Sequence, residues 1–455
     1  LVTRLLRGCD VLRVTKKEHD LSLHALTAIT ALFRKRMFFR RFLPFLIAAC
    51  LSSFFLVSII YDLSWNQGLQ LIGVGSTEER STTHNEEAKE FHTPSVNYSS
   101  PYPVGKTKPF GSNYTKALVI PKLKSEDTSW IENELGDMIE SGSLLPAIYT
   151  VNDRHASLHP PKNKGHEVMV YLSYIIDFYD SLPDISIFMH AHRFAWHNMQ
   201  LLDHDAAKML RFLSPEKVAR DGYMNLRCHA DPGCPEWLHP GNLVENPDKP
   251  EELLVAKSWS ELFPLDPIPP VLAQACCAQF AVSKARILET NRMRYIYLRD
   301  WMIRTELTDY LSGRVFEYVW QWIFAKVSVF CPDEGVCHCD GYGLCFGGGG
   351  GLERYMEMKM LKNELEEDLR VWREKKDILE KSKVEGGRNG GGWWRFLETA
   401  ELSVPEPGKD EVLRRQIEKL EVSMKGLWDE AFERGKDPKQ RAQEAGRVWR
   451  DGDGF

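Results

Sequence analysis

The chain has 455 residues, 43% of them hydrophobic, and 58 Lys and Arg residues nearly balance 64 Asp and Glu residues, for a net charge of −6. This length predicts two or three globular units at most, with enough apolar side chains for a real core. The balanced charge excludes a generally basic nucleic-acid binder, because affinity for phosphates needs clustered positive charge. No nucleic-acid partner is therefore expected.

The first predicted element is a transmembrane helix over residues 42–61, a stretch that contains no charged side chain. Such a helix spans roughly 30 Å of hydrocarbon. Residues 1–41 are basic, and the positive-inside rule leaves this tip in the cytosol and the rest of the chain in the lumen. The prediction is a single-pass protein of the Golgi or endoplasmic reticulum, with the lipid bilayer as a partner. A signal peptide and a buried core helix are the alternatives.

Residues 62–116 predict a flexible stem, because they are rich in Ser, Thr, Asn and Pro and show no sustained hydrophobic period. N-x-[ST] tripeptides make Asn97 and Asn113 candidate glycosylation sites on the lumenal side. Such a tripeptide also arises by chance, so each one alone is a weak indication.

A single folded unit is predicted over residues 117–347. Its first part contains a strand-like run at 117–121, an amphipathic helix over 166–180 and a buried strand over 185–189. Strand, helix and strand in this order favour an α/β domain with a mostly parallel sheet. Later elements are expected at 278–282 as a strand, and at 292–303 and 312–325 as helices.

A Gly-rich linker and a charged tail, residues 348–455, follow the folded unit. Helical patterns over 352–383 and 410–434 lack a sustained heptad. A helical hairpin or a partly disordered tail is therefore favoured over a long coiled coil. These helices are candidates for contact with a protein partner.

The most suggestive polar cluster follows the predicted strand 185–189, where ligands of open α/β sheets bind. His190 and His192 are two residues apart on an extended segment, so they face one side and can share a divalent cation, Mn²⁺ or Mg²⁺. Arg193 can pair with a phosphate and is a candidate catalytic residue. Alternatively, these side chains cap loops and stack on neighbouring aromatic rings.

Asn163 and Lys164 lie just before the predicted helix 166–180. Free N–H groups at a helix N-terminus favour an anion, so both residues are candidates for substrate binding. The segment lacks the spacing of the known dinucleotide and phosphate motifs, and an ordinary helix start is the alternative.

Two further positions carry candidate carboxylates. The triplet DHD at 203–205 has the D-x-D pattern with which many nucleotide-sugar transferases hold a metal, and it makes Asp205 a third candidate ligand. Asp205 equally suits the N-cap of a following helix. Arg314 and Glu317, three residues apart on a helix, form either a structural salt bridge or a substrate-binding arginine beside a catalytic base.

Eight of the ten cysteines lie in the folded unit, which favours disulfide bonds in an oxidising compartment. Cys228 and Cys234 flank a short loop that a disulfide could close, but the pairing cannot be read from sequence. Zinc is a minority interpretation, because structural zinc sites usually show C-x2-C pairs. The disulfide candidates are Cys228, Cys234, Cys276, Cys277, Cys331, Cys337, Cys339 and Cys345.

Several segments share one resemblance, and they are SEDTSWIENEL (125–135), LHPPKNKGHEVMVYLSYIIDFYDSLPD (158–184), IFMHAHRFAWHN (187–198), YMNLRCHADPGCPEWLHPG (223–241), SELFPLDPIPPVLAQACCAQFAVS (260–283), LRDWMIRTELTDYLSGRVFEYVWQWIF (298–324) and FCPDEGVCHCDGYGLCFG (330–347). They resemble an uncharacterised fungal family, domain of unknown function 3431. The resemblance covers nearly all of residues 117–347. That family has no established activity, so the resemblance implies no functional residue.

A second, weaker likeness concerns the order of the elements, from the acidic-Trp turn through the NKG helix and the HAHR strand to the CCAQFAVS strand. This order looks like that of GT-A glycosyltransferases, which implies a single GT-A-like, Rossmann-like domain. It also implies sugar transfer from a nucleotide-sugar donor to a glycan acceptor. The alternatives are a non-catalytic lumenal binding domain and a metal-dependent hydrolase.

Overall fold

The structure, a computed structural model, describes residues 100–455 except 245, 248, 389–404 and 452. The predicted cytosolic tip, the transmembrane segment, Asn97 and most of the stem lie outside the described residues. Within the described residues, no helix is long and apolar enough to cross a lipid bilayer. The predicted transmembrane helix and membrane localisation are therefore not supported by the structure.

The centre of the described chain is a five-stranded sheet with the strand order β2-β1-β3-β6-β4. Successive residues of β1 point to opposite faces, so Ala117 and Val119 enter one core while Leu118 and Ile120 enter the other. A small second sheet pairs two short strands in parallel. The strands are β1 (Lys116–Lys122), β2 (Leu144–Thr150), β3 (Ile185–Phe188), β4 (Tyr223–Asn225), β5 (Ala273–Gln274), β6 (Phe280–Ser283) and β7 (Val329–Phe330).

The sheet is mixed, so the prediction of a mostly parallel, GT-A-like sheet is wrong. Strand β1 runs parallel to β2 and β3, whereas β6 runs antiparallel to both β3 and β4. The chain leaves β4 at Asn225 and re-enters the sheet at Phe280, and these two residues are paired. Because the chain leaves β4 and enters β6 at the same end of these strands, β6 has to run in the direction opposite to β4. A strand parallel to β4 would need a connection that returns to the other end of the sheet, and this connection does not do so.

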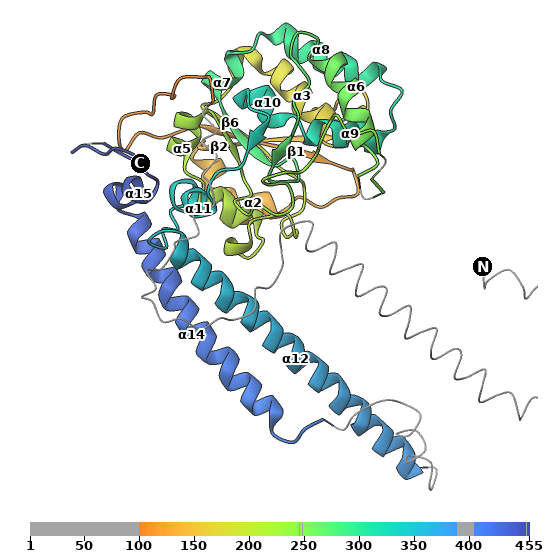
Figure 1. Ribbon diagram of the computed structural model, residues 1–455, viewed down its shortest axis with the longest axis vertical. Helices are drawn as coiled ribbons and strands as arrows, with labels where there is room; N and C mark the ends of the chain where they lie inside the picture. Colours follow the sequence, from red (N-terminus) through yellow and green to blue (C-terminus); the bar gives the residue numbers. More distant parts are fainter. Residues whose placement is uncertain (1–99, 245, 248, 389–404, 452) are drawn as a thin grey trace, which may run out of the picture. The chain divides into compact units, whose positions relative to one another are not determined.

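Helices cover both faces of the sheet (Figure 1). One core, rich in aromatic rings, lies between the sheet and α3 (Val168–Asp177), α6 (Glu252–Leu262), α8 (Arg292–Arg304), α9 (Asp309–Glu317) and α10 (Trp320–Ala325). The other lies under α2 (Trp130–Glu140), α4 (Ala206–Phe212), α5 (Pro215–Asp221) and α11 (Glu334–Tyr342). Shorter elements are η1 (Tyr179–Ser181), η2 (Gln200–Leu202) and α7 (Lys284–Leu288).

The C-terminal residues form α12 (Gly349–Arg388), α14 (Lys409–Gly435) and α15 (Pro438–Glu444). Helices α12 and α14 lie side by side (Figure 1), and Leu369, Leu413 and Ile417 form a small buried cluster. Figure 1 also shows these helices next to α11, where Cys345 donates its N–H to the carbonyl of Ala431 at 3.0 Å.

A buried carboxylate, Asp340 of α11, joins the C-terminal helices to the sheet domain. Its carboxylate contacts Arg220 at 2.8 Å, Lys217 at 3.6 Å and Arg447 at 2.8 Å. Its backbone carbonyl accepts a hydrogen bond from Arg441 of α15 at 2.6 Å. Only 2% of the Asp340 side chain is exposed, so these cations replace the water that the carboxylate loses on burial.

The predicted disulfide bonds are confirmed, because all eight cysteines of the described chain are paired. Cys228 and Cys234 do not close the short loop between them; each reaches about a hundred residues along the chain to the segment around α11. A loop of this length gives a disulfide a large entropic effect on the unfolded chain. The pairs are Cys228–Cys337, Cys234–Cys331, Cys276–Cys277 and Cys339–Cys345.

Candidate functional site

A pocket of about 470 Å³ opens at the carboxyl ends of the parallel strands β1, β2 and β3. This edge is where open α/β sheets bind their ligands. We call it the histidine pocket, and its lining residues are Pro121, Lys122, Leu123, Glu126, Val151, Asn163, His166, Glu167, His190, Ala191, His192, His197 and Asp309.

The loop after β3 is held by hydrogen bonds from buried amides. Gln279, just before β6, accepts from the N–H of His190 at 3.1 Å and donates to the Asn198 side chain at 2.9 Å. Asn198 in turn donates to the carbonyls of Arg193 and His204, both at 3.0 Å. These bonds fix the loop at both ends, so His190 and His197 occupy defined positions. The antiparallel direction of β6 brings Gln279 to this edge.

The turn before α3 places Glu167 on the opposite wall of the pocket. Gly165 and His166 both have positive φ, 74° and 52°, and Gly165 donates its N–H to Asp309 at 2.5 Å. Helix α9 packs closely here, because a Cβ on Gly313 would lie 2.6 Å from a ring carbon of His166. The left-handed turn and the close helix together direct Glu167 into the pocket.

Glu167, His190 and His197 form a connected line of titratable groups. His190 Nε2 lies 4.0 Å from a carboxylate oxygen of Glu167, and its Nδ1 lies 2.9 Å from Nε2 of His197, within hydrogen-bonding distance. Both nitrogens of His190 therefore face a group that can exchange a proton with it. Further out in the pocket, His192 lies 3.8 Å from Glu126.

The pocket shifts the pKa values of all three groups towards their neutral forms. Burial, reinforced by the nearby carboxylates of Glu317 and Asp309, raises the pKa of Glu167 to about 8. Burial lowers the pKa of His190 to about 3 and that of His197 to about 4. Strongly shifted groups that face one another in a cleft are typical of functional sites.

The structure places three of the predicted site residues in this pocket, namely Asn163, His190 and His192. The ammonium group of Lys164 instead donates to the carbonyl of Thr305 and is buried. Asn113, the candidate glycosylation site within the described residues, is exposed.

Arg193 and Asp205 pair with each other outside the pocket lining. The Arg193 guanidinium makes two hydrogen bonds to the Asp205 carboxylate, at 3.1 and 3.0 Å, and a third to Glu134 at 2.6 Å. Asp205 also accepts the N–H of Ala207 at 2.9 Å and so caps α4. This is the N-cap role that the sequence offered as the alternative to metal binding.

Arg314 and Glu317 form a salt bridge at 2.6 Å. Arg314 also binds the buried Glu251 at 2.8 Å, and Glu317 accepts the N–H of Cys277 at 2.7 Å. Both side chains are thus engaged with protein groups. Glu317 acts on the pocket indirectly, because its negative charge is one of the causes of the raised Glu167 pKa.

Among the described residues, the group close enough to hold a metal ion is Cys339, Cys345 and Glu444. Its two cysteines are joined in a disulfide, so they offer no thiolate to a cation. The predicted ligands His190, His192 and Asp205 do not gather in this way in the described chain. Imidazole nitrogens and carboxylates do line the histidine pocket, and these are donors that Mn²⁺ accepts.

Sequence reasoning missed Glu167 and His197 as functional residues. Both lie inside segments that it had singled out, NKGHE and HAHRFAWHN. His197 is seven residues after His190 on a loop, and no regular period relates the two. The only local signal for Glu167 is its position at the start of the predicted helix 166–180.

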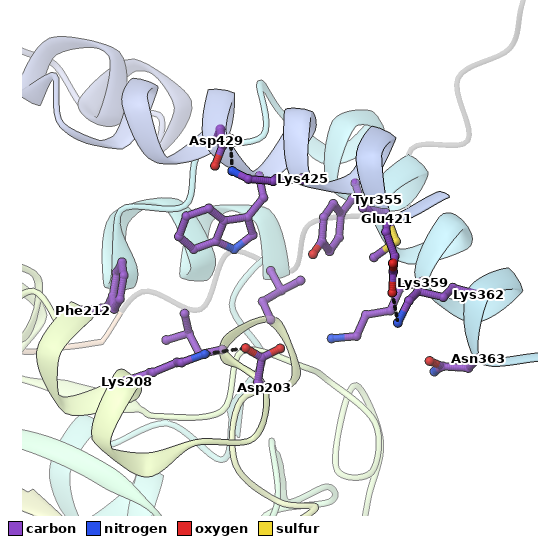
Figure 2. Close-up of a pocket in the computed structure, with 14 residues that line it drawn as sticks. Asp203, Lys208, Phe212, Tyr355, Lys359, Lys362, Asn363, Glu421, Lys425 and Asp429 are labelled. Carbon is purple, nitrogen blue, oxygen red and sulfur yellow. Dashed lines mark hydrogen bonds and ion pairs between the residues drawn. The ribbon is translucent and has the colours of Figure 1, made fainter. Parts of the chain in front are cut away.

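A second cavity, of about 490 Å³, lies between the loop before α4 and the helices α12 and α14 (Figure 2). Figure 2 shows Lys208 paired with Asp203 at 2.6 Å and Lys425 with Asp429 at 2.5 Å, while Lys359 donates to the backbone carbonyl of Gln200 at 2.6 Å. Because these lysines are engaged with protein groups, this cavity is a weaker candidate than the histidine pocket.

The fold and the histidine pocket together define a mixed α/β domain with a polar pocket at the carboxyl edge of its sheet. Residues 118–340 match the family model described as "Protein of unknown function (DUF3431)". This match confirms the resemblance of the α/β domain to that family, which its sequence segments indicate. No curated protein and no solved structure matches the chain, and the likeness to GT-A glycosyltransferases is not confirmed.

Proposed function

We propose that the α/β domain is an enzyme that transfers a glycosyl group, with Glu167 as its acid–base residue. The observation that carries the proposal is the alignment of Glu167, His190 and His197 in the pocket at the carboxyl ends of β1 and β3. The nucleotide-sugar donor and the glycan acceptor that the sequence suggested belong to this proposal.

The pKa of Glu167 suits the removal of a proton from a hydroxyl group. A general base works best when its pKa lies near the working pH, and burial raises the pKa of Glu167 to about 8. Glu167 takes the proton of the acceptor hydroxyl as that oxygen bonds to the anomeric carbon. The bond to the leaving group breaks, and the leaving group departs with the electron pair. The proton stays on Glu167, whose pKa of about 8 lies far above the pKa of about 3 of His190, until it is released to solvent.

The predicted holders of the leaving phosphate need a revised assignment. Lys164, Arg193 and Arg314 are hydrogen-bonded to protein groups, while Asn163 and Lys122 line the pocket. A divalent cation near His190 and His192 remains part of the proposal. It would supply the positive charge for the leaving phosphate that Lys164, Arg193 and Arg314 do not supply. The donor set of imidazoles and carboxylates fits such an ion.

The test uses the full chain and a panel of nucleotide sugars, with Mn²⁺ or with EDTA, and measures release of the nucleoside diphosphate. We expect Glu167→Gln to lower the rate by about 10²–10⁴-fold, the usual effect of losing a general base. Glu132→Gln is the matched control, because Glu132 is an exposed residue of α2 and its loss should leave the rate unchanged.

Equal rates for wild type and Glu167→Gln would overturn the assignment of Glu167. Absence of turnover with every donor, in Mn²⁺ and in EDTA, would favour the non-catalytic binding domain instead.

A further inference from the structure

Trp196, on the loop after β3, is unusually exposed for a tryptophan. Its side chain is 65% exposed, whereas the other tryptophans of the described chain are buried or half-buried. Burial of an indole is strongly favoured, so a large exposed ring calls for a reason. Trp196 immediately precedes His197, which lines the histidine pocket, and the two rings meet edge to face with centroids 5.6 Å apart.

The exposed indole is supported from one side by a buried arginine. The guanidinium carbon of Arg227 lies 5.3 Å from the centre of the Trp196 ring. Arg227 is itself only 9% exposed, and it donates to the sulfur of Cys276 at 2.6 Å and to the carbonyl of Asp231 at 2.8 Å. One face of the indole therefore rests on a fixed cation.

The support beneath Arg227 continues into the pocket wall. Cys276 is bonded to Cys277, and Cys277 donates its N–H to Glu317, whose charge raises the pKa of Glu167. Trp196 and Glu167 are thus connected through Arg227, the Cys276–Cys277 disulfide and Glu317. The ring position is set by its contacts with Arg227 and His197.

We propose that Trp196 is a stacking platform for a sugar ring of the substrate, which extends from the histidine pocket over the indole. This inference rests on the proposed glycosyl transfer and names the residue that recognises the sugar. The C–H face of a pyranose packs on the negative face of an indole. Its hydroxyl groups then meet the hydrogen-bonding side chains of the pocket, among them His197 and Glu167.

A nucleobase is also a flat ring, but the neighbouring wall offers imidazoles and carboxyls rather than an apolar slot. Such groups suit a ligand with many hydroxyls. The experiment therefore sets neutral trisaccharides of glucose, mannose and N-acetylglucosamine against free uridine, and measures binding to the full chain by ligand-observed NMR.

We expect at least one trisaccharide to bind and Trp196→Ala to weaken its binding about tenfold, a loss that corresponds to one ring contact. Trp196→Phe keeps a ring and should retain most of the affinity. Phe194→Ala is the matched control: Phe194 is also exposed, by 62%, but its ring lies beside Arg193 and not beside His197. Its loss should leave binding unchanged.

The inference is overturned if no trisaccharide binds, if only uridine binds, or if Trp196→Ala binds like wild type. Glu167→Gln separates it from the proposed function. If this variant binds the sugar normally and keeps full turnover, the acid–base role fails while the platform stands. If turnover depends on Glu167 but sugar affinity ignores Trp196, the platform alone fails.

Discussion

Glu167 occupies a position that costs the folded protein stability. Its pKa rises from 4.5 to about 8 on folding, chiefly through burial. Between these pH values the folded chain keeps a proton that the unfolded chain releases. The unfolded state then binds fewer protons, so the free energy of unfolding falls as the pH rises from about 4.5 to about 8. A buried carboxyl kept at such a cost is typical of functional residues.

The Glu167→Gln substitution should change how the stability of the chain depends on pH. Glutamine keeps the shape and does not titrate, so we expect the variant to be more stable than wild type by a few kcal/mol at pH 8 and no more stable near pH 4. Urea unfolding at both pH values checks this. Glu132→Gln should follow the wild-type curve, and a constant difference between wild type and Glu167→Gln would contradict the prediction.

The histidines have the opposite effect on stability. The pKa of His190 falls from 6.5 to about 3 and that of His197 from 6.5 to about 4, in both cases chiefly through burial. Between about pH 3 and pH 6.5 the folded state therefore binds fewer protons than the unfolded state. The free energy of unfolding that depends on the neutral histidines is fully present above pH 6.5 and is lost as the pH falls towards 3.

Residue types alone identified only part of the site. His190, His192 and Asn163 were found because they follow a strand end or precede a helix, which are local signals. Glu167 was missed because its unusual pKa depends on burial and on Asp309 and Glu317, which lie far along the chain. No local pattern in the sequence records that proximity.

Helix α9 shapes the pocket through a residue without a side chain. Gly313 lets the helix approach the turn that holds His166, and a Cβ there would also meet the backbone of Gly165 at 3.3 Å. The position of Glu167, two residues after Gly165, therefore depends on close packing between α9 and this turn.

We predict that Gly313→Ala moves α9 away from the turn and lowers stability by about 1–3 kcal/mol, the usual result of overpacking. Turnover should fall as well, because Glu167 loses its alignment with His190. The matched control is Gly426→Ala in α14, where a Cβ meets nothing within 4 Å and alanine should stabilise the helix by about 1 kcal/mol. Thermal unfolding and the transferase assay test both variants; unchanged stability in Gly313→Ala would refute the role of close packing.

The direction of β6 shows why the sheet could be predicted only in part. The apolar runs near 117, 185 and 280 indicated strands, and the structure has β1, β3 and β6 there. Direction depends on the edge at which the chain re-enters, and the connection from Asn225 to Phe280 is too long and irregular to reveal it. The order of strands and helices alone therefore predicted a mostly parallel sheet, which is wrong.

For the described chain as a whole, Asp340 is the connection between the α/β domain and the C-terminal helices. It is a buried acid among Lys217, Arg220 and Arg447, with Arg441 on its carbonyl. Loss of its charge leaves several cations close together and partly buried, which is the costly case for a buried ion pair.

We expect Asp340→Asn to destabilise the chain by about 3 kcal/mol and to make α15 more accessible to protease. Asp429→Asn is the control, since Asp429 forms an exposed pair with Lys425 on α14 and should change stability by less than about 0.5 kcal/mol. Urea unfolding and limited proteolysis measure the two effects. Equal behaviour of the two variants would show that Asp340 does not hold the helices.

The arrangement around Asp340 also has a consequence for synthesis of the chain on the ribosome. Asp340 is the last residue of the part that matches the family, yet Arg441 follows it by 101 residues and Arg447 by 107. A nascent chain that has completed residues 118–340 still lacks both of these arginines. The domain therefore reaches its final charge balance only after at least 107 further residues have been synthesised.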